Sequence, residues 1–278
     1  MENKINKITQ RIKNHFLKNN DNEANNDVKE QSEEKIFFNS ERTWLNVDKI
    51  YITDKIYIRI PTVGEVLKDE NTYYSITSSL TSTAFQFMVQ LDDMGLDYTK
   101  VTDYELFLIL FPIYAQSDMS LLFGDLDTSD FEIYTDKNGG LPFLYSPKND
   151  ITIDELIYND ITNVIRKINS YEKVKSKAGN ESAKKYLLEK ERRKQKRNKN
   201  KKKDSYLEKL VIALVNTDDF PYDYNTCMNL SIYNFNQSFK QIQQRITFDN
   251  TMIGVYAGTV DTSKMSNKDA LSWIATNK

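Results

Sequence analysis

The chain has 278 residues, of which 38 are Lys or Arg and 40 are Asp or Glu, so its net charge is close to zero. This length allows one large domain or two small ones. No apolar run approaches the ~18 residues that a membrane-spanning helix needs, and the N-terminus carries no signal-peptide core. We therefore expect a protein without a membrane span.

Catalytic and metal-binding patterns are scarce in this sequence. Its one histidine, His15, excludes a Ser-His-Asp triad, a Cys-His pair and a His-rich metal site. Its one cysteine, Cys227, excludes an internal disulfide and is expected to be a small buried side chain. No GxGxxG or GxxxxGK motif offers a phosphate-binding loop, and no pair stands out among the 40 acidic residues for acid–base catalysis. We expect no enzymatic activity and no cofactor.

The N-terminal part of the chain is predicted to be separate from the body. Residues 1–19 place apolar side chains three and four positions apart, which is typical of one face of an amphipathic helix. The candidate partner-binding stripe on this helix consists of Ile5, Ile8, Ile12 and Phe16. Residues 20–34 are polar and lack aromatic side chains, which indicates a flexible linker. The body is then expected to span residues 35–278.

Two β-hairpins are predicted in the body. Isoleucines alternate with other residues from Ile50 to Ile60, around a turn at Thr53–Lys55. Further along, strands at 131–134 and 141–145 flank a turn with two glycines, which can adopt positive φ. Residues 151–153 are expected to add a short strand.

Three helix starts are predicted from capping boxes, in which a Thr is followed three residues later by a Glu. They are Thr62 with Glu65, Thr102 with Glu105, and Thr152 with Glu155. The second box opens the most apolar helix, residues 106–114, which we expect at the centre of the core. The third opens an amphipathic helix with an apolar stripe made of Leu156, Ile157, Ile161, Val164, Ile165 and Ile168.

The last third of the chain is expected to be helical. Ser205 starts a helix after the basic segment, and a longer helical pattern follows from Asn225 with Gly258 as its C-terminal cap. Ile242 and Ile246 belong to this pattern, and a candidate partner-binding face is formed by Tyr233, Phe235 and Phe239. A final short helix is predicted from Ser266, carrying Leu271, Trp273 and Ile274. The predicted fold is mainly α with small β-hairpins (α+β), an irregular helical body with a protruding basic helix at about 180–203.

The basic segment Lys184–Lys203 has the most functional alternatives. It holds twelve Lys or Arg and two Glu, whereas the rest of the chain holds 26 basic and 38 acidic residues. Its only apolar cluster, Tyr186–Leu188, predicts that the first turns dock on the body and that the remainder extends into solvent. Its candidate partner-binding residues are Lys190, Arg192, Arg193, Lys194, Lys196, Arg197, Lys199 and Lys201. Three interpretations remain: a solvated helix or a contact within the chain, an acidic surface of a protein partner, and nucleic acid.

Acidic clusters elsewhere are interpreted as solvated groups. Asp125, Asp127 and Asp130 resemble a loose cation-binding loop, but the Gly and Glu that an EF-hand requires are missing. Asp92 and Asp93 are expected at the end of a helix. The sequence therefore predicts no metal site.

Six segments within residues 44–274 stand out together. In chain order they are IRIPTVGEVL (58–67), LDDMGLDYTKVTDYELFLILFP (91–112), LLFGDLD (121–127), ERRKQKRNKNK (191–201), VIALVNTDDFPYDY (211–224) and SFKQIQQRITFDNTMIGVYAGTVD (238–261). They resemble an uncharacterised group of tail-region proteins in phages of Gram-positive bacteria. The resemblance implies a phage structural or morphogenesis protein, such as a tail assembly chaperone, and it carries over no active-site residue.

From this resemblance, and from the lack of catalytic motifs, we expect a non-enzymatic phage tail assembly or tail structural protein that acts through protein–protein contacts. Its partners would be other phage tail proteins, the tape-measure protein among them. It would act in the host cell cytoplasm during assembly or in the virion tail. The alternative is a nucleic-acid-binding accessory protein that uses residues 184–203. The oligomeric state stays open.

Overall fold

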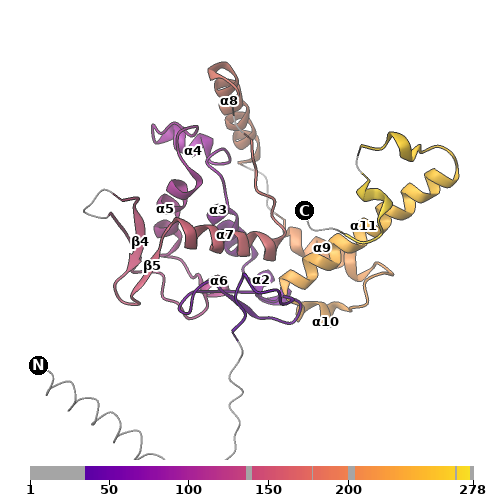
Figure 1. Ribbon diagram of the computed structural model, residues 1–278, viewed down its shortest axis with the longest axis horizontal. Coiled ribbons are helices and arrows are strands. Elements are labelled where there is room, and N and C mark those ends of the chain that lie inside the picture. Colours follow the sequence, from indigo (N-terminus) through magenta and orange to yellow (C-terminus); the bar gives the residue numbers. More distant parts are fainter. Residues whose placement is uncertain (1–34, 136–139, 177, 200–203, 267, 276–278) are drawn as a thin grey trace, which may run out of the picture. The chain divides into compact units, whose positions relative to one another are not determined.

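The computed structural model describes residues 35–135, 140–176, 178–199, 204–266 and 268–275 (Figure 1). The chain divides into two units, Met1–Glu34 and Lys35–Lys278. The helix predicted for residues 1–19, with Ile5, Ile8, Ile12 and Phe16, lies outside the described residues, as do the linker at 20–34 and His15. These remain predictions from the sequence.

The second unit is mainly helical. Helices make up about 51% of the structure, beside two small antiparallel sheets, which confirms the predicted α+β class. The helices are α2 (Val63–Lys68), α3 (Glu70–Leu80), α4 (Met88–Asp93), α5 (Asp103–Tyr114), α6 (Ser120–Phe123), α7 (Glu155–Asn169), α8 (Glu181–Asn198), α9 (Tyr206–Val215), α10 (Tyr224–Met228) and α11 (Ile232–Tyr256), with 3-10 turns η1 (Thr262–Lys264) and η2 (Asp269–Leu271). The strands are β1 (Lys49–Tyr51), β2 (Tyr57–Arg59), β3 (Glu132–Tyr134), β4 (Phe143–Ser146) and β5 (Ile151–Ile153).

Both predicted hairpins are confirmed. Strands β1 and β2 pair antiparallel, with Ile50 opposite Ile58, and both of these side chains are fully buried. The turn between them closes when the Ile56 N–H donates to the Thr53 hydroxyl at 3.0 Å. The second sheet has the order β3-β4-β5, in which Leu144 lies opposite Ile153 on the buried face. Period-two alternation thus marks the covered face of each sheet.

Helices α5 and α7 form the centre of the core, as predicted for the apolar stretch at 106–114. The ring of Phe107 in α5 packs on Tyr158 in α7, with centroids 4.8 Å apart. Phe111 meets Phe123 and Phe131 edge to face. Burying each of these rings contributes about 2–3 kcal/mol. A smaller apolar cluster lies beside this core and contains Leu91, Leu106 and Leu188 among others.

Two of the three predicted capping boxes are confirmed. The Thr62 hydroxyl accepts from the Glu65 N–H at the start of α2, and Thr102 caps α5 in the same way. The third prediction is wrong, because Thr152 pairs with Tyr145 inside the second sheet. Asp154 caps α7 instead, through its carboxylate. Thr152 belongs to the strand predicted at 151–153, and its place in that strand prevents it from capping the helix.

Further expectations are corrected at exposed positions. Leu156 was expected on the inward stripe of α7 but is exposed, because it lies in the first turn, beyond the edge of the buried face. In place of the final helix predicted from Ser266, the structure has only the short turn η2. Trp273 and Ile274, expected on that helix, are both exposed. Gly258 does cap α11, with φ of 72°.

The first turns of α11 are joined to the start of α2. The Ile232 N–H donates to the Pro61 carbonyl at 2.8 Å, and the Val63 N–H donates to the Leu230 carbonyl at 2.8 Å. Ser231 caps α11 through its hydroxyl. These bonds fix the N-terminal end of a 25-residue helix in the body.

Candidate interaction surface on the basic helix

Helix α8 carries the basic segment and has a docked side. Asn180 caps the helix, because its side chain accepts from the Ala183 N–H at 2.8 Å. The side chains that are at least partly buried recur three or four positions apart, and they are Ala183, Lys184, Leu187, Leu188, Glu191 and Gln195. Leu188 joins the apolar cluster around α4, which Figure 1 shows beside α8. Tyr186 does not dock as expected, because it points to the opposite side and is exposed.

Two cations of α8 are paired with acidic groups of the body. The Arg192 guanidinium lies 2.7 Å from the Asp92 carboxylate and 2.6 Å from that of Asp93, both at the end of α4. Lys184 lies 2.8 Å from the Asp97 carboxylate. The hydrogen bond from Lys184, together with those from Thr99, holds the pKa of Asp97 well below its usual range. The helix is therefore attached by an apolar contact flanked by ion pairs.

The other candidate cations that the structure describes are exposed, and we call this exposed set the outward face. It consists of Lys190, Arg193, Lys194, Lys196, Arg197 and Lys199, while Lys201 lies outside the described residues. Arg193 pairs with Glu189 at 3.0 Å and Lys194 with Glu191 at 3.6 Å, within the helix. Such intrahelical pairs contribute only about 0.2–0.5 kcal/mol. The outward face keeps an excess of positive charge.

The structure thus separates Arg192 from the remaining cations that the sequence grouped with it. Arg192 faces the body, and its pKa is raised by hydrogen bonds to Asp93 and Asp92. The partners Asp92, Asp93 and Asp97 were missed in the sequence because they lie far from α8 along the chain. The acidic balance of the rest of the chain indicated such a contact but did not identify the carboxylates.

The aromatic face predicted in α11 is not a surface. Phe235 is fully buried and Tyr233 nearly so, with the Tyr233 ring 5.8 Å from that of Trp44. Phe239 is partly buried against the same core. The prediction is corrected because the N-terminal turns of α11 are covered by the body on this side. Tyr233 and Phe235 therefore stabilise the fold and are not available to a partner.

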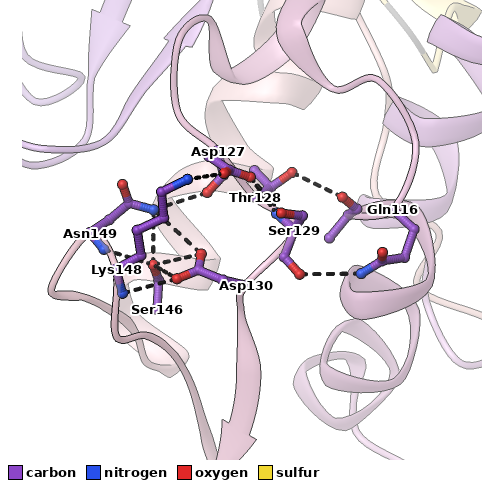
Figure 2. A network of polar contacts seen from close by, with 9 residues as sticks. Gln116, Asp127, Thr128, Ser129, Asp130, Ser146, Lys148 and Asn149 are labelled. Atoms are coloured by element: carbon purple, nitrogen blue, oxygen red, sulfur yellow. Dashed lines mark hydrogen bonds and ion pairs between the residues drawn. The ribbon is translucent and has the colours of Figure 1, made fainter.

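In the acidic loop after α6, carboxylates accept hydrogen bonds from donors of the same chain (Figure 2). Asp127 accepts from the Lys148 ammonium and from Ser129, which lowers the pKa of Asp127 below its usual range. Asp130 accepts from the Ser146 hydroxyl at 2.8 Å and from the Lys148 N–H at 3.0 Å. The loop is therefore tied to the turn between β4 and β5. These carboxylates act as structural acceptors.

Other chemical groups give no candidate centre. Cys227 is fully buried, as predicted, and burial raises the pKa of its thiol. Within the part of the chain that the structure describes, no cluster of His, Cys, Asp or Glu side chains has a metal-binding arrangement. None of the helices described is both long and apolar enough to cross a bilayer.

Comparison with known proteins gives one finding. Residues 198–278, which include α9, α10 and α11, match the family model of the YomV second domain. This is a phage-derived protein family of Bacillus. No curated protein and no solved structure matches the chain. The match fits a phage protein of Gram-positive bacteria.

Proposed function

We propose that this chain is a non-enzymatic phage protein that acts in tail assembly, or as part of the tail structure, through protein–protein contacts. Its partners are other tail proteins, with the helix-rich tape-measure protein as one client. It works in the host cytoplasm during assembly or in the virion tail. The match of residues 198–278 supports the phage origin, and the resemblance of the six body segments supports the tail role.

The single observation that carries the protein-contact part of the proposal is the two-sided arrangement of α8. On one side, Arg192 and Lys184 pair with carboxylates of a folded surface. On the outward face, the same residue types are exposed at helical spacing. Complementary charge guides association and sets its specificity. An acidic surface of another protein is the chemical counterpart of the outward face.

The test compares tagged wild-type protein with two triple variants in infected cells. The first changes the outward face at Lys190, Arg193 and Arg197 to Gln. The matched control changes Lys68, Lys100 and Lys175 to Gln, which are exposed lysines elsewhere on the body. We expect tail proteins to co-purify with wild type and control, and to be depleted with the outward-face variant. If wild type retrieves no tail protein, as judged by mass spectrometry, the proposed tail role is wrong.

A second candidate function is binding of nucleic acid by the same outward face. It is favoured by the exposure of Lys190, Lys194, Lys196 and Arg197 along successive turns of one helix. Each phosphate contacted contributes a slope of about −0.9 to the logarithm of affinity against the logarithm of salt concentration. Filter binding with duplex DNA and RNA across a salt series measures this slope. Binding that stays unchanged when these four residues become Gln excludes α8 as the site.

A further inference from the structure

Helix α11 carries a mainly apolar seam along its whole length, and the body covers only the N-terminal part of it. Side chains alternate three and four positions apart, the spacing of heptad positions a and d in a coiled coil. In order, this α11 seam consists of Ile232, Phe235, Phe239, Ile242, Ile246, Asp249, Ile253 and Tyr256. The helix is continuous throughout the seam. One stripe therefore runs from the body to the far end of the helix.

The seam changes from buried to exposed along the helix. Ile232 and Phe235 are fully buried, and Ile242 is 7% exposed. Beyond them, exposure rises from 49% at Ile246 to 67% at Ile253 and 82% at Tyr256. The outer seam, Ile246 to Tyr256, spans about 15 Å, or three helical turns.

The C-terminal segment after α11 packs on a different flank of the helix. The Gln241 side chain donates to the Trp273 carbonyl at 2.7 Å, and that of Gln244 donates to the Asp269 carbonyl at 2.7 Å. These glutamines occupy heptad positions c and f, away from the seam. Among the residues described, none after Ile242 is buried. The segment thus supports the helix and leaves the outer seam uncovered.

We propose that the outer seam is the docking site for an amphipathic helix of a partner protein. The stripe continues a packed helix–helix seam, so the geometry that fits it is a second helix with aliphatic side chains at its own a and d positions. This inference rests on the proposed protein-contact function and adds a second contact site to the outward face of α8, with the chemistry of the partner at that site. Each isoleucine of the outer seam that the partner helix covers stabilises the complex, because its aliphatic surface is removed from water.

Asp249 indicates that the partner is a different chain from this one. It occupies a d position within the outer seam, and its side chain is 58% exposed with the Arg245 Nε 3.9 Å away. In a parallel pair of two copies, two Asp249 carboxylates would face each other. In an antiparallel pair centred on this stretch, Asp249 would lie against Ile253. A partner helix with Lys or Arg at the facing position instead gives a complementary pair.

The binding test uses two synthetic helical peptides of about 21 residues, or three heptads. Both have Ile at a and Leu at d, and the position facing Asp249 is Lys in one peptide and Glu in the other. Fluorescence anisotropy measures their affinity for the full chain. We expect wild type to prefer the Lys peptide and Asp249→Lys to prefer the Glu peptide. Ile253→Asp should weaken binding at least about tenfold, because it places a charge in the seam.

The control is Ile212→Asp in α9, since Ile212 is 48% exposed, like Ile246, and lies outside the seam. This variant should bind the Lys peptide as wild type does. Equal binding by Ile253→Asp and wild type would overturn the proposal. So would a wild-type dimer that Ile253→Asp converts to a monomer in sedimentation, because the seam would then pair two copies.

Retrieval from infected cells separates this inference from the proposed function. If wild type and Ile253→Asp retrieve the same tail proteins equally well, the tail role stands and the seam is not its site. If the peptide results are as expected but wild type retrieves no tail protein, the seam binds helices and the tail role is wrong. If wild type retrieves tail proteins and Ile253→Asp does not, the result supports both the tail role and the seam as a docking site.

Discussion

Glu65 links the first hairpin to the first helix through two oxygens. One oxygen accepts from the Thr62 N–H at 2.8 Å, and the other lies 2.9 Å from the Arg59 guanidinium. Burial by itself raises the pKa of Glu65, but the hydrogen bonds from Thr62 and Arg59 outweigh it and lower the pKa below its ordinary value. A carboxylate whose pKa is lowered by folding stabilises the folded state above its unfolded pKa. That stability is lost as pH falls through the folded pKa.

Replacing Glu65 with Gln should therefore have a pH-dependent effect. Gln still accepts from the Thr62 N–H but removes the charge opposite Arg59. We expect a loss of about 0.5–1 kcal/mol at pH 7, because the pair is partly exposed. Urea unfolding at several pH values should show the difference between variant and wild type shrinking below pH ~4.5. The Glu105→Gln variant, in the second capping box, controls for the change to an amide. A difference that persists undiminished at pH 3 would contradict this account.

At the scale of single elements, the attachment of α8 should depend on salt. Asp92→Asn with Asp93→Asn removes both carboxylates that contact Arg192. Each exposed pair contributes about 0.2–1 kcal/mol, so the variant should open α8 more often without unfolding the body. Hydrogen exchange should quicken severalfold in Glu181–Asn198 and stay unchanged in α7. Added salt should speed exchange of α8 in wild type, because it screens the pairs. Its effect should be smaller in the variant, in which the Lys184–Asp97 pair remains. An unchanged exchange rate would mean that Leu188 and the Lys184–Asp97 pair hold the helix without the Arg192 pairs.

The sequence predicts those features of each element that arise from neighbouring residues. The capping of α2 and α5 depends on side chains three positions apart, and both hairpins depend on alternation, so these predictions are confirmed. Thr152 was misassigned because it also lies in the predicted strand at 151–153, where it pairs with Tyr145 of the neighbouring strand. Periodicity also identifies an apolar face without revealing what covers it. For this reason Phe235 was predicted on a partner-binding face, although it is fully buried.

At the scale of the whole molecule, sequence reasoning found the cations of the candidate surface but not their division between two sides. That division depends on Asp92 and Asp93, whose distance from Arg192 in the chain hides the pairing. The same holds for the outer seam of α11, since its exposure depends on where the body ends. Both surfaces are defined by tertiary contacts that stop partway along a helix. Local patterns contain no information on that point.

The body should remain folded without the outer part of α11. A chain that ends at Arg245 keeps Ile242, the last buried residue among those described, and the Arg245–Asp219 ion pair at 3.0 Å. The described residues that it removes are exposed or half-buried, so little apolar area leaves the core. We expect a loss of at most about 1 kcal/mol in urea unfolding, together with loss of binding to the Lys peptide. A loss above about 3 kcal/mol, the size of a large core truncation, would mean that the distal helix supports the body. The part of α11 after Arg245 would then have a structural role, and its exposure would not indicate a docking site.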